Sequence, residues 1–314
     1  MNSTSSIAVV IPVFNKRSSI LRTLQCIVAQ TTPVTEIVVV DDCSTDGSVE
    51  VVESSQIDRL RIIKNVSQLG PGAARDVGWR SCQSDYIAFL DADDEWDPRF
   101  IEVALDLARR FPQAGACATG YRVVSRGGFF LDVVNRVEEN EPTLVQNYFE
   151  RSCTSQLMWT SCTVLPRHVL HAVNGWPAMR WGGDLFLWAR IAVKYPVACS
   201  PEVLATYRLD GPNRDSDKYG TSAIGSIMDF LNQSINNGSI LPAQWPHVRR
   251  YLAKIGFAAA RQMVLQGEGG AARGILAKCP GREANIRLWW VLSWFASPLT
   301  RPLIKAVVRR YRRR

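Results

Sequence analysis

Three absences narrow what this sequence can be: histidine is scarce, cysteines are unpaired, and no secretory signal stands at the start. The 314 residues hold three histidines and eight cysteines, and no two cysteines form a Cys-x-x-Cys pair. That pattern argues against a zinc site and a disulfide framework, and it predicts reduced core thiols. The apolar run 7–14 follows no cation and contains Pro12, unlike a secretory signal. We therefore expect a cytoplasmic protein.

Two phosphate-binding loops are also absent. The stretch GPGAAR from Gly70 has Gly-x-Gly, but Arg75 stands where a dinucleotide fingerprint needs its third glycine. No Walker-type loop occurs either. The uncharged run 288–300 is shorter than the roughly 20 apolar residues that cross a bilayer, so the sequence predicts no transmembrane span.

The positive charge is confined to one place. The formal net charge is +8, and the segment 301–314 holds seven Lys and Arg residues without an acid. The rest of the chain is therefore close to neutral. A basic face spread over the body, and with it a nucleic-acid partner, is not expected.

The first 120 residues alternate between two kinds of apolar spacing. Short Ile- and Val-rich runs indicate buried strands, and runs with apolar residues three and four apart indicate helices. We expect strands at 7–14, 36–42, 60–65 and 85–91, and helices at 18–30, 46–55 and 71–82. This alternation predicts an α/β protein with a parallel sheet and right-handed crossovers.

Polar residues follow these strands. Asn15 follows the first strand, Asp41 and Asp42 end the second, and Asp91 and Asp93 end the fourth. Ligands of open α/β sheets bind outside the carboxyl ends of the strands. The residues are therefore candidates for a binding site at that edge.

Helix capping accounts for only part of this negative charge. We interpret Asp46 and Asp97 as residues that support the starts of the next helices. The four carboxylates between 91 and 95 would repel one another unless a cation compensates them. Oxygen ligands without histidine or cysteine favour Mg²⁺ or Mn²⁺, which commonly also bind substrate phosphates. The sequence thus predicts a nucleoside diphosphate as the ligand.

Four motifs at this edge resemble one enzyme family. They are VVIPVFN from Val9, VVVDDCSTDGS from Val38, GPGAARDVGW from Gly70 and FLDADDEWDP from Phe89. In this order and spacing they look like the landmarks of family 2 glycosyltransferases, which are inverting enzymes with the GT-A fold. The resemblance covers about residues 5–210. It implies a Rossmann-like, mainly parallel sheet flanked by helices.

The resemblance also implies the nucleotide site. Pro12, Val13 and Asn15 would lie by the nucleotide. Asp42, with Asp41 beside it, would accept a hydrogen bond from the imide N–H of uracil or thymine, which favours a UDP-sugar.

Three further residues come from the same resemblance. Arg75 would lie near the nucleotide or diphosphate, although a surface arginine paired with Asp76 or Asp41 is the alternative. Asp93 would be the metal ligand and Asp91 would contact the donor sugar or the metal, whereas Asp94 and Glu95 could face outward.

A fifth landmark lies in GWPAMRWGGDLFLWAR from Gly175. By this match Asp184 is the catalytic base, although Gly183 replaces the family's usual Glu. Capping of the helix that follows is the alternative role of Asp184. Trp181 is the candidate for stacking on an acceptor sugar, in preference to Trp159 and Trp176, and Asp210 is a candidate ligand of the metal or diphosphate.

These signals divide the chain in two. Residues 1–214 are expected to form the catalytic domain, with a nucleotide-sugar half at about 1–120 and an acceptor half at about 121–214. Residues 215–314 are expected to form a helical appendage of three segments, with Gly269 and Gly270 separating the last two. The aromatic and basic segment 287–314 suits either a helix lying on an anionic membrane surface or a packed helix with a solvated tail.

The expected activity is inverting sugar transfer. A sugar would pass from a UDP-sugar to a glycan or polyprenyl-linked acceptor in one metal-assisted displacement, which would suit a protein peripheral on the inner face of the cell membrane. The alternatives are a nucleotidyltransferase, and a non-catalytic lipid- or nucleic-acid-binding protein on a degenerate transferase domain.

Overall fold

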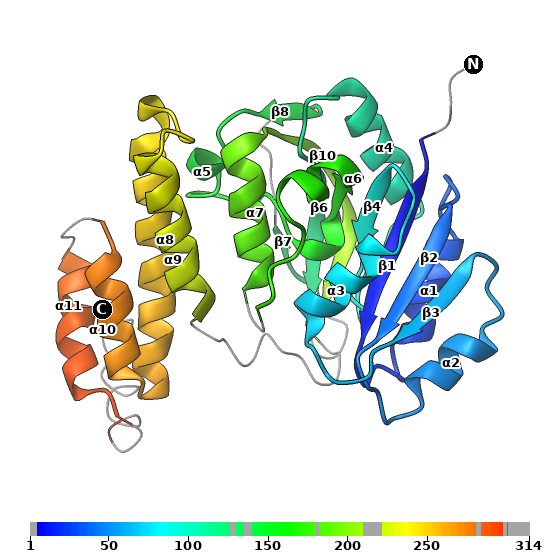
Figure 1. Cartoon of the computed structure of the whole chain (residues 1–314), viewed down its shortest axis with the longest axis horizontal. Helices are drawn as coiled ribbons and strands as arrows, with labels where there is room; N and C mark the ends of the chain where they lie inside the picture. Colours follow the sequence, from blue (N-terminus) through cyan, green and yellow to red (C-terminus); the bar gives the residue numbers. More distant parts are fainter. Residues whose placement is uncertain are drawn as a thin grey trace. The chain divides into compact units, whose positions relative to one another are not determined.

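A computed structural model describes residues 5–125, 130–134, 140–179, 182–209, 222–280, 284–297 and 300. The chain divides into two compact units, Met1–Lys218 and Tyr219–Arg314. Figure 1 shows the first as a sheet with helices on its faces and the second as a group of helices.

The first unit opens with the alternation that the sequence predicts. Its elements in order are β1 (Ile7–Val13), α1 (Ile20–Val28), β2 (Glu36–Asp41), α2 (Ser48–Ser54), β3 (Leu60–Lys64), α3 (Pro71–Arg80) and β4 (Tyr86–Phe89). The four strands pair in parallel in the order β3-β2-β1-β4. The parallel α/β half is therefore confirmed.

The second part of this unit extends the same sheet with mixed pairing. Its strands are β5 (Glu95–Trp96), β6 (Ala116–Val124), β7 (Phe130–Val134), β8 (Thr143–Val145), β9 (Thr163–Pro166) and β10 (Val197–Arg208). Its helices are α4 (Phe100–Arg110), α5 (Tyr148–Arg151), the short η1 (Thr160–Cys162), α6 (Arg167–Ala172) and α7 (Gly183–Lys194). The sheet continues as β4-β9-β6-β10-β5, with β9 antiparallel to both neighbours and β10 parallel to β6.

Burial on both faces of the sheet explains why the first strands are continuous apolar runs in the sequence. Residues 37–41 of β2 are all buried, as a strand covered on both faces should be. Helix α1 turns Ile20, Leu24 and Ile27 toward the core. Helix α3 lies so close to the sheet that a Cβ on Gly78 would stand 2.3 Å from Cγ1 of Val10. A glycine is therefore required where α3 crosses β1.

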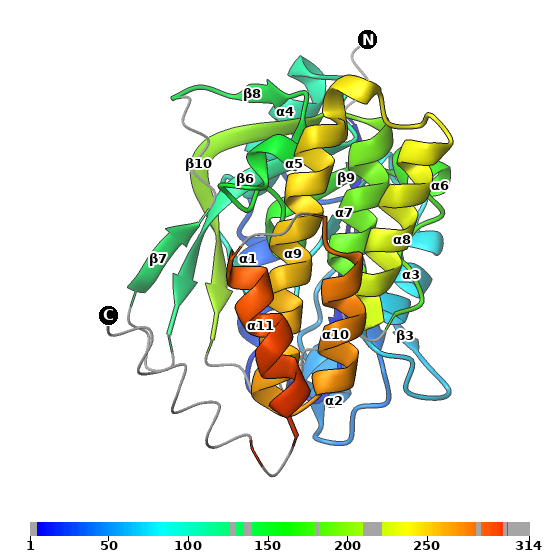
Figure 2. The same cartoon turned by 90° about the vertical axis from the view of Figure 1, so that its left-hand side faces the viewer.

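The second unit is helical. It contains α8 (Ser222–Asn236), the short η3 (Pro242–Gln244), α9 (Trp245–Gln266), α10 (Gly269–Lys278) and α11 (Ala284–Phe295). Figure 2 shows α11 running beside α10 and α9, and these elements pack together. The three predicted helical segments correspond to α8, α9 and α10.

The position of the predicted break was wrong. Gly267, with φ of 88°, ends α9, and Gly269 already belongs to α10. A Cβ on Gly269 would stand 2.0 Å from the carbonyl oxygen of Ser293. The glycine at 269 therefore permits close packing of α11 on α10 rather than separating two helices.

No helix among the described residues is long and apolar enough to cross a membrane.

Candidate active site

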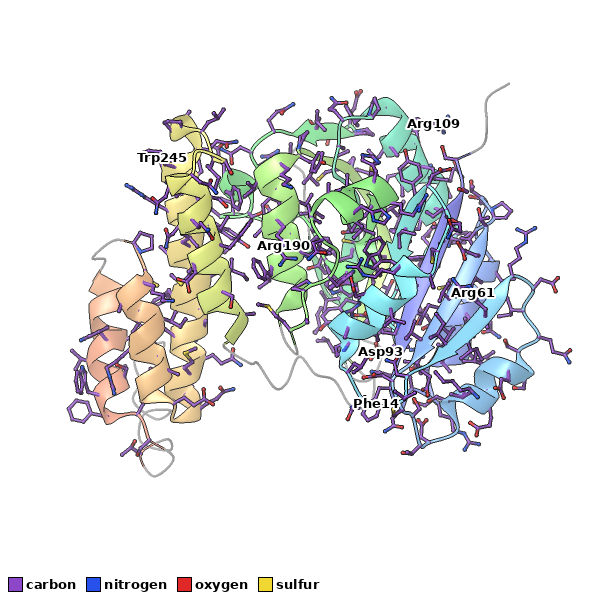
Figure 3. All side chains as sticks on the ribbon, viewed as in Figure 1. Phe14, Arg61, Asp93, Arg109, Arg190 and Trp245 are labelled. Carbon is purple, nitrogen blue, oxygen red and sulfur yellow. The ribbon has the colours of Figure 1, made fainter. Side chains whose placement is uncertain are left out.

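The parallel strands bring the predicted site residues to one edge of the sheet. Val13, the last residue of β1, pairs with Asp41 at the end of β2, and Val10 pairs with Phe89 at the end of β4. The loops that follow β1, β2 and β4 therefore begin side by side. Figure 3 labels Phe14 and Asp93 at this end of the sheet.

The loop after β1 and the loop after β2 hold each other. Asn15 lies in the left-handed region at φ of 53°, its N–H donates to Ser44 Oγ at 3.0 Å, and its Oδ1 accepts from Thr45 N at 2.8 Å. The Asp41 carboxylate accepts from Ser44 N at 3.1 Å. Asn15 and Asp41 therefore fix the backbone around the predicted nucleotide site.

Asp42 is bound to a different segment. Its carboxylate accepts from Asn65 Nδ2 at 2.8 Å, Leu69 N at 2.8 Å and Gly70 N at 2.7 Å, and the residue is 3% exposed. A carboxylate has about four lone-pair sites, so three are in use. Asp42 thus positions the segment 65–70 that leads into α3.

The acids after β4 are compensated by side-chain cations. Lys16 Nζ lies 2.6 Å from Asp93 Oδ2, and Arg75 forms a close ion pair with Asp91. Glu95 forms two ion pairs, one with Arg22 of α1 at 2.6 Å and one with Arg208 at the end of β10 at 3.1 Å. Each of these three carboxylates therefore has a cationic side-chain partner in the described structure.

Asp94 corrects the sequence interpretation most clearly. The sequence allowed it to face outward, but its side chain is buried, where it accepts from Ser161 Oγ at 2.8 Å and Arg208 N at 3.0 Å. Burial, with the charges of Asp93 and Asp91 adding to it, holds the pKa of Asp94 well above its ordinary value. Asp94 therefore ties the acidic loop to η1 and β10.

Arg75 is not the surface arginine of the alternative interpretation. The residue is 8% exposed, and its guanidinium lies 4.7 Å from the ring centroid of Trp176 while it pairs with Asp91. Within the described structure, neither Arg75 Nε nor Trp176 Nε1 has a hydrogen-bond partner, and both are buried. Arg75 thus links the acidic loop to the segment that precedes α7.

Asp184 lies in the first turn of α7, which begins at Gly183 after Gly182 in the left-handed region. Burial raises the pKa of Asp184, and the nearby carboxylate of Asp91 also raises it, whereas the backbone N–H of Leu185 and the charge of Arg75 lower it. The structure therefore brings Asp184 close to Arg75 and Asp91, residues that lie about a hundred positions earlier in the chain.

The tryptophans of this region differ in accessibility. Trp159, Trp176 and Trp188 are buried in the packed interior, at 8%, 4% and 0% exposure. Trp181 and Asp210 lie outside the described residues.

Asp46 and Asp97 behave as helix-start residues. Asp46 accepts from the backbone N–H of Ser48 at 3.0 Å, and Asp97 accepts from the backbone N–H of Arg99 at 3.2 Å.

The described side chains could hold Mg²⁺ or Mn²⁺ only if a substrate supplied further oxygen ligands. Among the described residues, no three His, Cys, Asp or Glu side chains form a group that could hold an ion. Asp93 and Asp91 are 12% and 26% exposed at the side chain and stand two positions apart after one strand. Mg²⁺ and Mn²⁺ are often bound by one or two carboxylates plus phosphate oxygens. The residues fit that arrangement and do not fit an all-protein cage.

Four residues of this site were missed by the sequence interpretation: Lys16, Arg22, Ser161 and Arg208. Lys16 directly follows Asn15, so its place after β1 was a usable signal. Ser161 and Arg208 come from η1 and β10, whose positions depend on antiparallel pairing far along the chain. Nothing local in the sequence indicates that they meet the acidic loop.

Comparisons with known proteins agree with this geometry. The family model described as glycosyl transferase family 2 matches residues 8–173. TuaG of Bacillus subtilis, named for teichuronic acid biosynthesis, is 27% identical over 249 residues, covering 77% of this chain and 93% of TuaG. AmsB of Erwinia amylovora, named for amylovoran biosynthesis, is 36% identical over 114 residues, covering 35% of this chain and 38% of AmsB.

Two solved structures share the architecture. The crystal structure of Staphylococcus aureus TarS residues 1–349 with UDP-GlcNAc matches with a TM-score of 0.72 at 18% identity, over 88% of this chain and 82% of that one. GalNAc-T7 with UDP, GalNAc and Mn²⁺ matches with a TM-score of 0.53 at 14% identity, over 66% and 44%. The family match covers more than half of the chain, and the fold agrees with it. The chain therefore belongs to glycosyltransferase family 2, with the GT-A fold, and it is a glycosyltransferase that takes its sugar from a nucleotide sugar.

Proposed function

We propose that this protein is an inverting glycosyltransferase that uses a UDP-sugar and Asp184 as its base. The observation that carries the proposal is the convergence of Asp184, Arg75 and Asp91 beside the Asp93 loop at the edge of the parallel sheet. An acid with a raised pKa next to a site for a nucleotide sugar is suited to general-base catalysis.

The donor would lie across the ends of β1, β2 and β4. Pro12, Val13 and Asn15 would border the nucleotide, with Asp41 supporting the loop from below. Three donors occupy three of the four lone-pair sites of the Asp42 carboxylate. We propose that the fourth site accepts a hydrogen bond from the imide N–H of uracil. A UDP-sugar donor is also consistent with the UDP-GlcNAc in the TarS crystal.

The chemical step follows from the positions of three side chains. Asp184 takes the proton from the acceptor hydroxyl, and that oxygen attacks the anomeric carbon as the bond to the diphosphate breaks, which inverts the configuration. Arg75 holds Asp91 toward the donor sugar, and its positive charge lowers the pKa of Asp184, which favours the ionised carboxylate.

The proposed mechanism includes a divalent ion, although the acidic side chains also have cationic side-chain partners. Asp93 would hold Mn²⁺ or Mg²⁺, with Asp91 contacting it through water or binding the sugar instead. When bound, the ion would neutralise the charge that develops on the leaving diphosphate. Lys16 would have to release Asp93, and it would then stand next to the same diphosphate.

The acceptor is proposed to be a glycan, including one carried on a polyprenyl lipid. TuaG is named for the biosynthesis of teichuronic acid and AmsB for that of amylovoran. An acceptor carried on a lipid would place the enzyme at the cytoplasmic face of the membrane, as a peripheral protein.

The test is release of UDP from a panel of UDP-sugars in the presence of glycan acceptors and Mn²⁺. Asp184→Asn should bind UDP as tightly as the wild type while turnover falls by about 10²–10⁴-fold, the usual contribution of a general base. Asp106→Asn, an exposed acid on α4, is the matched control and should keep full turnover.

Turnover of Asp184→Asn within a few-fold of the wild type would remove Asp184 as the base. If no UDP-sugar releases UDP beyond the uncatalysed rate, the donor assignment is wrong.

A further inference from the structure

The acidic loop after β4 folds into a tight turn. The N–H of Asp94 donates to the carbonyl oxygen of Asp91 at 3.0 Å, which closes residues 91–94 into a four-residue turn. Within it, the side chains of Asp91 and Asp93 are 26% and 12% exposed, whereas Asp94 is 0% exposed. The shape of this turn therefore decides where the two accessible carboxylates lie.

The hydroxyl of Ser161 joins the two ends of this turn. Ser161 Oγ accepts from the backbone N–H of Asp91 at 3.1 Å and donates to Asp94 Oδ2 at 2.8 Å. Ser161 is 0% exposed. Removal of its hydroxyl would leave a buried N–H without its acceptor, which costs more free energy than the loss of an exposed hydrogen bond. The hydroxyl is therefore a structural link between the first and last residues of the turn.

Ser161 is itself held in place by η1 and its neighbours. Its own carbonyl oxygen accepts from Trp96 Nε1 at 2.5 Å. The carbonyl oxygen of Trp159, just before η1, accepts from Thr163 Oγ1 at 2.8 Å. The ring of Trp159 packs against Tyr121, with ring centroids 4.8 Å apart. The short helix is therefore part of the packed core, and it gives the Ser161 hydroxyl a fixed position.

The supports of Asp91 and Asp93 differ. Arg75 pairs with the carboxylate of Asp91, and Ser161 holds the backbone N–H of the same residue. Asp93 is held by Lys16, whose Nζ lies 2.6 Å from Oδ2. Loss of the Ser161 hydroxyl should therefore displace Asp91 more than Asp93.

We propose that Ser161 is a positioning residue for the donor sugar and acts through the backbone of Asp91. A side chain from the second part of the sheet unit thus sets the geometry of a loop that follows β4 in the first part. This inference rests on the proposed function, in which Asp91 contacts the donor sugar, and it deepens that function by naming the residue that supports this contact.

The test compares how full-length wild type and Ser161→Ala bind UDP and UDP-sugars. Isothermal titration calorimetry with Mn²⁺ present gives the Kd of UDP, UDP-GlcNAc, UDP-glucose and UDP-galactose. For the UDP-sugar that the wild type binds most tightly, the ratio of its Kd to the Kd of UDP should rise about three- to tenfold in Ser161→Ala, the effect of one lost hydrogen bond. The Kd of UDP itself should stay close to the wild-type value, because the proposed nucleotide site is formed by the loops after β1 and β2.

Two further variants separate positioning from a loss of stability. Ser200→Ala removes another fully buried hydroxyl of the same unit, one that accepts from Glu202 N at 3.2 Å. Ser200 lies near the start of β10, whereas Arg208, which contacts the turn, ends that strand. The Kd ratio of Ser200→Ala should equal that of the wild type even where its Tm falls. Ser161→Cys keeps a weaker donor and acceptor, so its Kd ratio should lie between those of the wild type and Ser161→Ala.

The outcomes distinguish this inference from the proposed function. A wild-type Kd ratio in folded Ser161→Ala would overturn the inference and leave the proposed function intact. An equal rise in the Kd of UDP and of the UDP-sugar would also overturn it, because the hydroxyl would then support the whole site. Should Ser161→Ala fail to fold, Ser161→Cys decides, and an unchanged ratio in that variant overturns the inference. A wild type that binds neither UDP nor any of the UDP-sugars would overturn the proposed function and the inference together.

Discussion

At the scale of single residues, Lys16 neutralises part of the negative charge of the acidic loop after β4. Its Nζ lies 2.6 Å from Asp93 Oδ2, and both side chains are nearly buried, at 13% and 12% exposure. A lysine in this position competes with any cation that binds Asp93. The candidate metal ligand Asp93 is therefore held in an ion pair.

The first prediction concerns that competition. Lys16→Met should bind Mn²⁺ in the absence of nucleotide about three- to tenfold more tightly, since it removes a charge-assisted contact on the order of 1 kcal/mol. Titration with Mn²⁺ alone, followed by electron paramagnetic resonance, measures the affinity. Lys64→Met, from an exposed pair with Glu53, should leave it unchanged. Weaker Mn²⁺ binding by Lys16→Met would show that Lys16 supports the metal site instead of competing for it.

The second prediction concerns Asp94. Burial holds its pKa well above the ordinary value, so a neutral amide is a close substitute, and Asp94→Asn should remain folded with nearly wild-type stability. Asp94→Ala should lose about 1–3 kcal/mol of unfolding free energy, because Ser161 Oγ and Arg208 N lose their buried acceptor. Urea denaturation of both variants checks this, and equal losses in the two would contradict it.

The third prediction is a pH dependence at Asp184. Its pKa is raised in the folded protein, so the native state binds a proton that the unfolded chain releases, and stability falls as pH rises toward the folded pKa. Asp184→Asn should therefore have a higher Tm than the wild type at pH 8, and the difference should shrink toward pH 5. The rate of sugar transfer, which needs the ionised carboxylate, should change in the opposite sense and fall as pH is lowered. A Tm difference that does not vary with pH would argue against a raised pKa at Asp184.

At the scale of elements, the segment between α6 and α7 holds Arg75 from one side. Gly175 has φ of 58°, and a Cβ there would stand 2.4 Å from Asp76 Oδ1 and 2.7 Å from Trp79 Cζ2. Asp76 also accepts from Trp176 N at 3.0 Å, so the turn at Gly175 fixes the tryptophan that stacks on Arg75. The turn thus connects α3 to the active site.

The fourth prediction follows from that turn. Gly175→Ala should lose about 1–3 kcal/mol of stability through backbone strain and collision, and turnover should fall because Trp176 shifts beneath Arg75. Gly238→Ala is the matched control: it also has a left-handed φ, of 77°, but nothing lies within 4 Å of the added Cβ. Thermal unfolding and release of UDP measure both variants. Normal turnover in Gly175→Ala would separate this turn from the active site.

The helices and strands also differ in how far they could be predicted from the sequence. The strands and helices up to residue 91 follow from local patterns, because buried parallel strands and amphipathic helices have distinct periods. The contribution of η1 and β10 does not, since Ser161 and Arg208 reach the acidic loop through pairings between distant segments. The charge balance of the acidic loop shows the same limit: the acids were visible in the sequence, whereas the four cations that pair with them come from separate elements.

At the scale of the whole molecule, the chain joins a glycosyltransferase unit to a helical unit with a separate chemical character. The family match ends at residue 173, and the second unit contains the exposed aromatic side chains Trp290, Trp294 and Phe295 of α11. The division itself was predictable from the point where the family motifs stop. The exposed side of α11 was not, because its helix is apolar nearly all round in sequence and only packing reveals which side is free.

The measurement that tests the central claim most directly is calorimetric titration of the full-length protein with UDP, with and without Mn²⁺, repeated on Asp93→Ala. The account predicts that UDP binds the wild type, that Mn²⁺ strengthens this binding, and that Asp93→Ala loses the strengthening by Mn²⁺. Absence of UDP binding under every condition would contradict the proposed donor site at the carboxyl edge of the sheet.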